Sequence, residues 1–181
     1  MKPFWRTPII LTAIAGAIIT TILIFQRTNQ PSITFTEEWT ATQVIDGDSI
    51  TVGQTDGSKM SVELCGIDAP QVKQGEVPGQ ALSNESKQKL LKLVAAADNQ
   101  LMIIPVAKDE QGRTVAEVMA RGQGEAEISF QEELLKSGLA KTRLGGVECP
   151  NQLSFEQAAE IAKASKVGVG SQSKRNSRDQ Q

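Results

Sequence analysis

The first pattern along the chain is an uninterrupted apolar run. Residues 8–25 read PIILTAIAGAIITTILIF and contain no charged side chain. At helical rise, a run of this length spans about 27 Å, which is close to the hydrocarbon thickness of a bilayer. Lys2 and Arg6 precede the run and only Arg27 follows it closely, which favours a cytoplasmic N-terminus. The pattern therefore predicts a single transmembrane helix with the rest of the chain on the extracytoplasmic side.

Two other interpretations of this run are a cleaved signal peptide and a buried core helix. Ala13-Ile14-Ala15 has the residues of a signal-peptidase cleavage site, but it lies inside the apolar run, whereas a cleavage site follows the end of such a run. A core helix does not account for the N-terminal position and the polar exit. We therefore expect an uncleaved membrane anchor over residues 1–26, followed by a polar linker over residues 27–38.

Beyond the linker, the hydrophobic pattern changes to a period of two. Segments 39–45, 49–54 and 60–67 are rich in β-branched residues or alternate apolar with polar positions. The turn signals Asp46-Gly47 and Asp56-Gly57 separate them. This spacing predicts three consecutive strands in a meander. In the third, the pattern predicts one buried face and a second face that carries Glu63.

The second half of the chain mixes helical and strand patterns. It predicts helices over residues 81–97, 129–138 and 154–168, and strands over residues 100–107 and 114–120. Ser129 with Glu132, and Ser154 with Gln157, have the spacing of a capping box at a helix start. Five strands, with one helix after the third and two at the end, predict an α+β fold built on a five-stranded OB-fold β-barrel. The polar segment 171–181 predicts a disordered tail.

Composition narrows the chemistry that this domain can perform. The chain contains no histidine, which excludes imidazole general-base catalysis and His-ligated zinc. Its two cysteines, Cys65 and Cys149, permit one internal disulfide and lack the spacing of a metal finger. Residues 31–181 carry 16 of the 19 basic residues and all 21 acidic ones, a net charge of about −5. An acidic domain with few aromatic residues is expected to bind nucleic acid weakly.

Four segments resemble the staphylococcal nuclease (thermonuclease) family. They are Val44–Ile50 (VIDGDSI), Leu64–Pro70 (LCGIDAP), Asp109–Val118 (DEQGRTVAEV) and Leu134–Lys141 (LLKSGLAK). Each segment alone is a weak signal, but four in order and at family-like spacing are specific. The resemblance places a nuclease-like domain over residues 39–170.

The resemblance implies calcium-dependent hydrolysis of DNA or RNA phosphodiester bonds. It assigns Asp48 and Asp68 to the calcium ion, and Arg113 to a pair of arginines that clamps the phosphate. Carboxylates held at strand ends also suit a hard cation on general chemical grounds. The competing interpretation is that the two aspartates only cap turns, which is a common use of Asp. Lys136, Lys141 and Arg143 are expected to form a solvated face more readily than a basic groove near Arg113.

The sequence departs from the family pattern at two positions that the resemblance assigns to the active site. Glu63 stands where the resemblance implies the first arginine, and Gln71 stands where it implies a glutamate that helps to activate water. The family's active-site tyrosines have no counterpart, since the chain contains no Tyr. Loss of a group that stabilises developing charge typically lowers a rate by about 10² to 10³. Loss of a general base lowers it by roughly 10² to 10⁴.

Two functions follow from these observations. The first is a membrane-anchored module that is catalytically weak or inactive and that binds a protein partner in a membrane complex. The second is an active calcium-dependent endonuclease with an altered site. Glu63 and Gln71 favour the first. Because Glu63 adds a carboxylate to Asp48 and Asp68, the sequence also predicts that a three-carboxylate cation site survives without catalysis.

Overall fold

The computed structural model describes residues 37–73, 75–122, 126–143 and 145–169. The predicted membrane helix over residues 8–25 and the predicted tail over residues 171–181 lie outside these ranges. Among the described residues, no helix has the length and apolar character needed to cross a bilayer.

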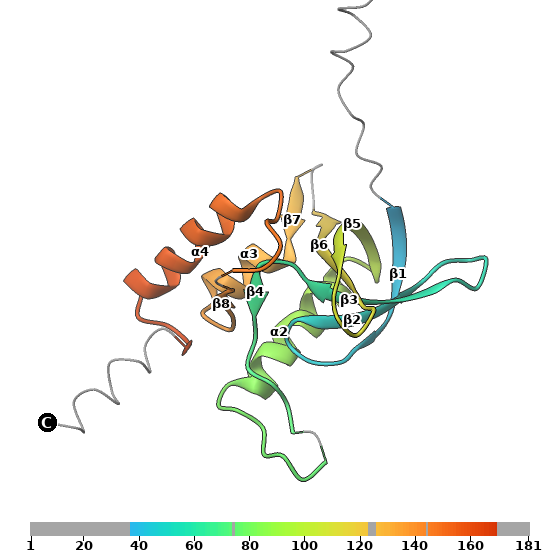
Figure 1. Cartoon of the computed structure of the whole chain (residues 1–181). Helices are drawn as coiled ribbons and strands as arrows, with labels where there is room; N and C mark the ends of the chain where they lie inside the picture. Colours follow the sequence, from blue (N-terminus) through green and yellow to red (C-terminus); the bar gives the residue numbers. More distant parts are fainter. Residues whose placement is uncertain (1–36, 74, 123–125, 144, 170–181) are drawn as a thin grey trace, which may run out of the picture. The chain divides into compact units, whose positions relative to one another are not determined.

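A closed β-barrel forms the centre of the described domain (Figure 1). Its strands are β1 (Glu37–Val44), β2 (Ser49–Gly53), β3 (Lys59–Leu64), β5 (Gln100–Lys108) and β6 (Thr114–Arg121). Antiparallel pairs join β3 to β2, β2 to β1, β1 to β5 and β5 to β6. The parallel pair of β3 and β6 closes the ring. This order confirms the predicted five-stranded barrel of the OB type.

Three helices accompany the barrel in the part of the chain that the structure describes. They are α2 (Ser83–Ala96), α3 (Phe130–Lys136) and α4 (Gln152–Ala164). Helix α3 packs against β6, and α4 packs against α3 (Figure 1). The short strand β7 (Glu127–Ser129) pairs antiparallel with the end of β6, and β4 (Ile67–Asp68) pairs antiparallel with β8 (Lys141–Thr142). The last pair lies next to the predicted site.

The barrel interior is filled by apolar side chains from alternate strand positions. Fully buried members are Ile50, Val52, Val62, Leu64, Ile103, Ala116 and Val118. Burying one Val, Leu or Ile side chain contributes roughly 1.5 to 3 kcal/mol. A buried polar bracket joins this barrel to α3: Gln131 accepts a hydrogen bond from Val118 N at 3.2 Å and donates one to Ala116 O at 3.1 Å.

The strand predicted over residues 60–67 consists of two separate elements. β3 ends at Leu64, and Gly66 follows with a φ of 72°, which favours glycine. A Cβ at Gly66 would lie 2.9 Å from Cys149 Sγ, so a side chain there has no room. The chain turns away from the barrel at this glycine and then forms β4, which pairs with β8.

The two predicted helix caps have different outcomes. Ser129 caps α3, because its Oγ accepts a hydrogen bond from Glu132 N at 3.3 Å. The start predicted for the last helix at Ser154 is wrong, since α4 begins at Gln152. The cause is a tertiary contact: buried Glu117 accepts hydrogen bonds from the backbone N and the Nδ2 of Asn151, both at 2.6 Å. This contact fixes the residue just before the helix.

Candidate active site

A tight turn between β1 and β2 positions Asp48. Asp48 N donates to Asp46 Oδ1 at 3.1 Å, and Asp48 O accepts from Leu64 N at 2.8 Å. The turn needs glycine at position 47, because a Cβ there would lie 2.0 Å from Ser86 Oγ in α2. The turn is therefore held against both β3 and α2.

The carboxylate of Asp48 lies inside the protein, with 3% of the residue exposed. Its Oδ2 accepts a hydrogen bond from Ala69 N at 2.6 Å. Burial raises the pKa of Asp48 to about 8; the Ala69 hydrogen bond lowers it, and Asp46 and the charge of Glu63 raise it further. In the absence of a cation, Asp48 is therefore mostly protonated at neutral pH.

Asp68 is half-buried at the end of the two-residue strand β4. Its register partner in β8 is Lys141. The Lys141 Nζ lies 3.0 Å from Asp68 Oδ2, so this carboxylate already has an intramolecular cation beside it.

Arg113 lies at the end of the hairpin loop between β5 and β6. Asp109 organises this loop: its Oδ1 accepts from Gln111 N at 2.9 Å and from Arg113 N at 2.8 Å. Its Oδ2 accepts from Arg113 Nε at 2.6 Å. Burial lowers the pKa of Arg113, but the Asp109 hydrogen bond and the charges of Glu63, Asp109 and Asp48 raise it on balance. Arg113 is thus fixed in place and fully charged.

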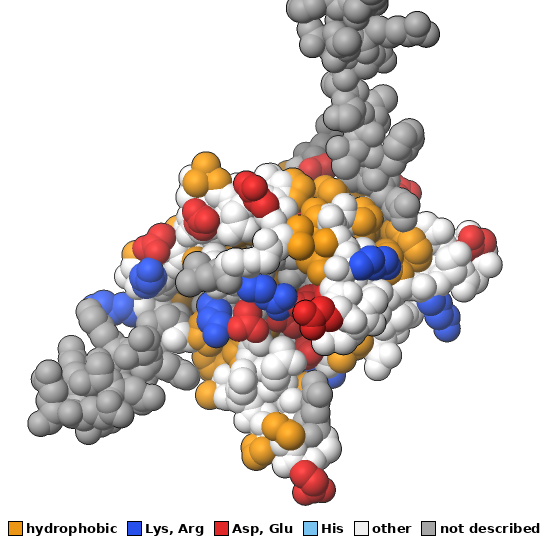
Figure 2. Space-filling view, in the orientation of Figure 1, with side chains coloured by type: hydrophobic (Ala, Val, Ile, Leu, Met, Phe, Trp, Pro, Cys, Tyr) orange, Lys and Arg blue, Asp and Glu red, His pale blue; other side chains and the backbone are white. Residues whose placement is uncertain are grey.

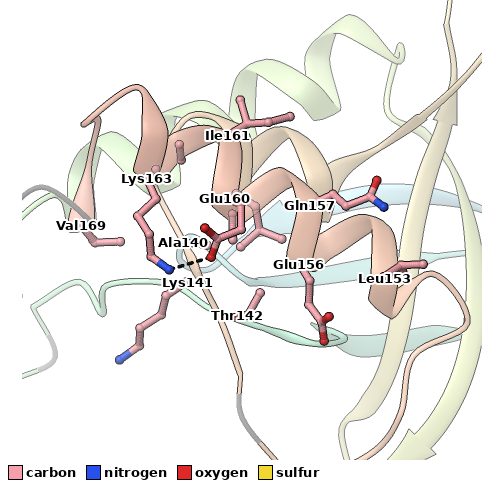
Figure 3. A pocket seen from close by; sticks show the side chains of 14 residues that line it. Ala140, Lys141, Thr142, Leu153, Glu156, Gln157, Glu160, Ile161, Lys163 and Val169 are labelled. Atoms are coloured by element: carbon pink, nitrogen blue, oxygen red, sulfur yellow. Dashed lines mark hydrogen bonds and ion pairs between the residues drawn. The ribbon is translucent and has the colours of Figure 1, made fainter.

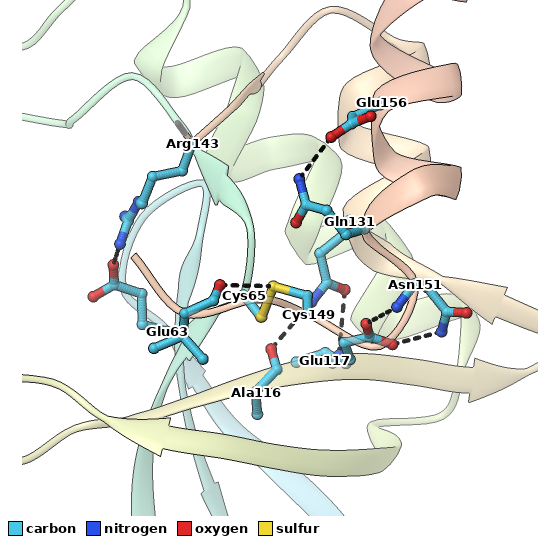
Figure 4. The surroundings of a disulfide bond; sticks show 12 residues. Glu63, Cys65, Ala116, Glu117, Gln131, Arg143, Cys149, Asn151 and Glu156 are labelled. Carbon is cyan, nitrogen blue, oxygen red and sulfur yellow. Dashed lines mark hydrogen bonds and ion pairs between the residues drawn. A yellow bond between two sulfur atoms is a disulfide. The ribbon is translucent and has the colours of Figure 1, made fainter. Parts of the chain in front are cut away.

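Glu63 is buried, which corrects the prediction that it lies on an open face of β3. Only 5% of the residue is exposed. Its Oε2 forms an ion pair with Arg113 Nη2, and its Oε1 lies 2.5 Å from Arg143 Nη1. Figure 4 shows Arg143 reaching Glu63 from the segment after β8. The carboxylate therefore lies between two guanidinium groups.

Arg143 was expected on a solvated face with Lys136 and Lys141, but the structure places its guanidinium group on Glu63 in this site. It follows β8, and its backbone N donates to Gly66 O at 2.9 Å. No motif marks it, because its contact with Glu63 depends on the pairing of β4 with β8. A predicted β4–β8 pair would have been the only signal for its position.

Gln71 has a local role in the loop after β4. Its Nε2 donates to Ala69 O at 3.2 Å, and its backbone N donates to Gln80 Oε1 at 3.0 Å. The amide cannot accept a proton at neutral pH, so this position supplies no general base.

A disulfide between Cys65 and Cys149 settles the cysteine state that the sequence left open. The two Cα atoms are 6.1 Å apart, and both residues are buried. The bond ties the end of β3 to the segment that precedes α4 (Figure 4). It therefore links the segment that follows Glu63 to the segment that follows Arg143.

The prediction that Glu63 joins Asp48 and Asp68 in a three-carboxylate cation site is wrong. The described ranges contain no group of three or more His, Cys, Asp or Glu residues that could hold a metal ion. Glu63 pairs with Arg113 and Arg143 instead. Calcium takes six to eight oxygen ligands, which include backbone carbonyls and waters, so Asp48 and Asp68 would supply only part of the set, and Asp68 would have to leave Lys141. Calcium binding by Asp48 and Asp68 stays a prediction.

The surface around the site carries charges of both signs. Figure 2 shows acidic and basic side chains interleaved on the displayed face, without a continuous basic patch. Such a surface gives little non-specific attraction for a polyanion.

A separate cleft of about 700 Å³ lies along α4, with Leu153 and Ile161 among its lining residues (Figure 3).

Comparisons with known proteins bear on what this arrangement is. A family model described as "Staphylococcal nuclease homologue" matches residues 61–172. A thermonuclease of Staphylococcus hyicus is 29% identical over 129 residues, which cover 71% of this chain and 73% of that protein. A thermonuclease of Staphylococcus intermedius is 29% identical over 167 residues, which cover 84% of this chain and 92% of that protein. The matched segment contains Glu63, Asp68, Arg113 and Arg143, and Asp48 precedes it.

Proposed function

Because the chain belongs to the staphylococcal nuclease family, we propose that it is a binding module built on the nuclease fold, with weak or absent phosphodiester hydrolysis. One observation carries this proposal: the buried carboxylate of Glu63 lies where a phosphate clamp needs positive charge, and it pairs with both nearby arginines.

The charge balance at Arg113 supports the proposal. Phosphoryl transfer depends mainly on positioning and on cations that neutralise the developing negative charge. Arg113 contacts the carboxylates of Glu63 and Asp109, and Arg143 also pairs with Glu63, so these four side chains together carry no net positive charge. A phosphate oxygen about 4 Å from Glu63 would be repelled by about 4 kcal/mol at an effective dielectric constant of 20. The arrangement therefore disfavours the negatively charged transition state.

The missing base acts in the same direction. Gln71 replaces a proton acceptor with an amide that hydrogen-bonds to Ala69 O. The chain has no histidine that could take over the proton transfer. A rate loss of roughly 10² to 10⁴ follows from this change alone.

An active calcium-dependent endonuclease is the second candidate. It is favoured by the presence of Asp48, Asp68 and Arg113 at the matching positions on the barrel. A cleavage assay of the full-length chain in detergent, with DNA and RNA substrates and with and without calcium, separates the candidates. Calcium-dependent cleavage well above background supports the endonuclease, and background cleavage of both substrates supports the binding module.

A protein in a membrane complex is the partner that we propose for the module. The exposed outer face of α4 supports it, since Leu153 and Ile161 are 68% and 53% exposed beside the cleft. Clusters of exposed apolar side chains commonly mark interaction sites. Loss of co-purification on changing both residues to Asp, with the fold retained, tests this assignment.

We also propose that residues 8–25 anchor the module in a membrane, with the barrel on the extracytoplasmic side. The apolar run and its flanking charges support this topology. The disulfide between Cys65 and Cys149 supports it independently, since such bonds persist in oxidising compartments.

A further inference from the structure

The geometry points to a masked anion site: we infer that Arg113 and Arg143 form a binding site for a phosphate group, and that Glu63 fills it as an internal carboxylate. The inference deepens the proposed function and rests on it, because it identifies the contact that keeps phosphate out.

Two guanidinium groups from separate parts of the fold converge on one carboxylate. Arg113 comes from the hairpin before β6, and Arg143 comes from the segment after β8. Each pairs with a different oxygen of Glu63. Arginine pairs of this kind bind oxyanions such as carboxylates and phosphates. Arg143 thereby supplies, from a loop, a positive charge that the β3 strand position lacks.

The carboxylate of Glu63 uses only some of the hydrogen-bond donors that the two arginines offer. Its two oxygens are each directed to one guanidinium group: Oε2 pairs with Arg113 and Oε1 pairs with Arg143. Two guanidinium groups together carry far more N–H donors than the two oxygens of one carboxylate can accept. A phosphate group has more oxygens and more negative charge than a carboxylate, so it can use the donors of both arginines more completely.

The two arginines are also held by contacts that do not involve Glu63. Asp109 accepts from Arg113 Nε at 2.6 Å, and Gly66 O accepts from Arg143 N at 2.9 Å. The disulfide of Cys149 fixes the segment that follows Arg143. Neutralising Glu63 should therefore leave the two guanidinium groups in place, with one more unit of positive charge between them.

Phosphate binding by variants of the full-length chain in detergent tests this inference. Titration calorimetry with inorganic phosphate, at constant ionic strength, is run on the unmodified chain, Glu63→Gln and the double variant Glu63→Gln/Arg143→Gln. The matched control is Glu133→Gln, because Glu133 is a carboxylate paired with Lys89 elsewhere on the surface.

We expect Glu63→Gln to bind phosphate at least 10-fold more tightly than the unmodified chain. Glu133→Gln should bind like the unmodified chain, and the double variant should lose the gain. Glu63→Gln that binds no more tightly, or a gain that survives the loss of Arg143, would overturn the inference.

A second measurement covers variants that are poorly folded. The melting temperature of Glu63→Ala is compared in phosphate and in chloride at matched ionic strength, since a ligand that binds only the folded state stabilises it. We expect phosphate to raise the melting temperature of Glu63→Ala by several degrees and that of the unmodified chain by much less. If phosphate neither raises the melting temperature of Glu63→Ala nor promotes its folding, the inference is contradicted.

Failure of this inference can be told apart from failure of the proposed function. Cleavage of DNA or RNA by the unmodified chain contradicts the binding module, whatever the phosphate titrations show. Competition between phosphate and a short single-stranded oligonucleotide on Glu63→Gln then identifies the source of the phosphate group. Displacement supports a site for nucleic-acid backbone, and its absence supports a site for free phosphate.

Discussion

Glu63 Oε1 lies 2.5 Å from Arg143 Nη1, which joins β3 to a segment far along the chain. Glu63 stands where the family resemblance implies an arginine, and Arg143 brings a guanidinium to the same place from another element. The opposite charges explain how a glutamate is tolerated in a buried position next to Asp48, whose pKa is raised.

Arg143→Ala is expected to destabilise the domain by about 1 to 3 kcal/mol. Removal of one partner leaves a buried carboxylate less well compensated, although the partial exposure of Arg143 reduces the effect. Urea unfolding measures the change, and Lys163→Ala, which breaks an exposed ion pair with Glu160, should cost less than about 0.5 kcal/mol. In a Glu63→Gln background, Arg143→Ala should lower the free energy of unfolding by clearly less. An equal decrease in both backgrounds would show that Glu63 and Arg143 are not energetically coupled.

Removal of the disulfide should lower the free energy of unfolding by more than Arg143→Ala does. Cys65 and Cys149 are 84 positions apart, and closing a loop of that length corresponds to about 4 to 5 kcal/mol in the chain-entropy model. Reductant should therefore lower the free energy of unfolding of the unmodified chain by this order. It should leave a Cys65→Ser/Cys149→Ser variant unchanged. Equal stability of the unmodified chain with and without reductant would contradict the prediction.

Asp48 should make stability fall as pH rises. Burial raises its pKa in the folded state to about 8 from a usual value of 3.8, so the folded state holds the proton more tightly. Between these two values the folded state binds more protons than the unfolded one. The free energy of unfolding therefore decreases with pH, by at most about 1.4 kcal/mol per pH unit from this group. Urea unfolding in EDTA at pH 5 and pH 8 should show this decrease, and Asp48→Asn should reduce it.

The same variant tests calcium binding. If the carboxylates of Asp48 and Asp68 bind calcium, millimolar calcium stabilises the ionised form of Asp48 and makes the pH slope in the unmodified chain shallower. Calorimetry should then detect calcium binding that Asp48→Asn removes. Binding that is indifferent to this substitution would exclude Asp48 as a ligand.

Protease accessibility tests the proposed topology. If residues 8–25 form an anchor with its N-terminus inside, protease added to right-side-out vesicles should digest the barrel domain. The same domain should be protected in inverted vesicles until detergent is added. Protection in right-side-out vesicles would contradict the proposed orientation.

The fold was predictable because its signals are local. Alternation in the strands, the hairpin signal Asp56-Gly57 and the cap at Ser129 each specify structure within a few residues, and the structure confirms the barrel that they predict together. The start of α4 was missed because Glu117, on β6, fixes Asn151 through a tertiary contact that has no local signal.

The site was only partly predictable for the same reason. Motifs located Asp48, Asp68 and Arg113, and they showed that Glu63 departs from the family pattern. They could not show that Arg143 lies beside Glu63, because that contact depends on the pairing of β4 with β8. The interpretation of Glu63 as a third metal carboxylate was wrong, since two guanidinium groups surround it.

The cleavage rate of single-stranded DNA, measured with calcium for the unmodified full-length chain and for Glu63→Gln/Gln71→Glu, tests the central claim most directly. This double variant frees the two arginines from Glu63 and restores a carboxylate at position 71. The account predicts background cleavage by the unmodified chain and an increase of about 10² or more in the double variant. Cleavage by the unmodified chain at a rate that the double variant does not improve would contradict it.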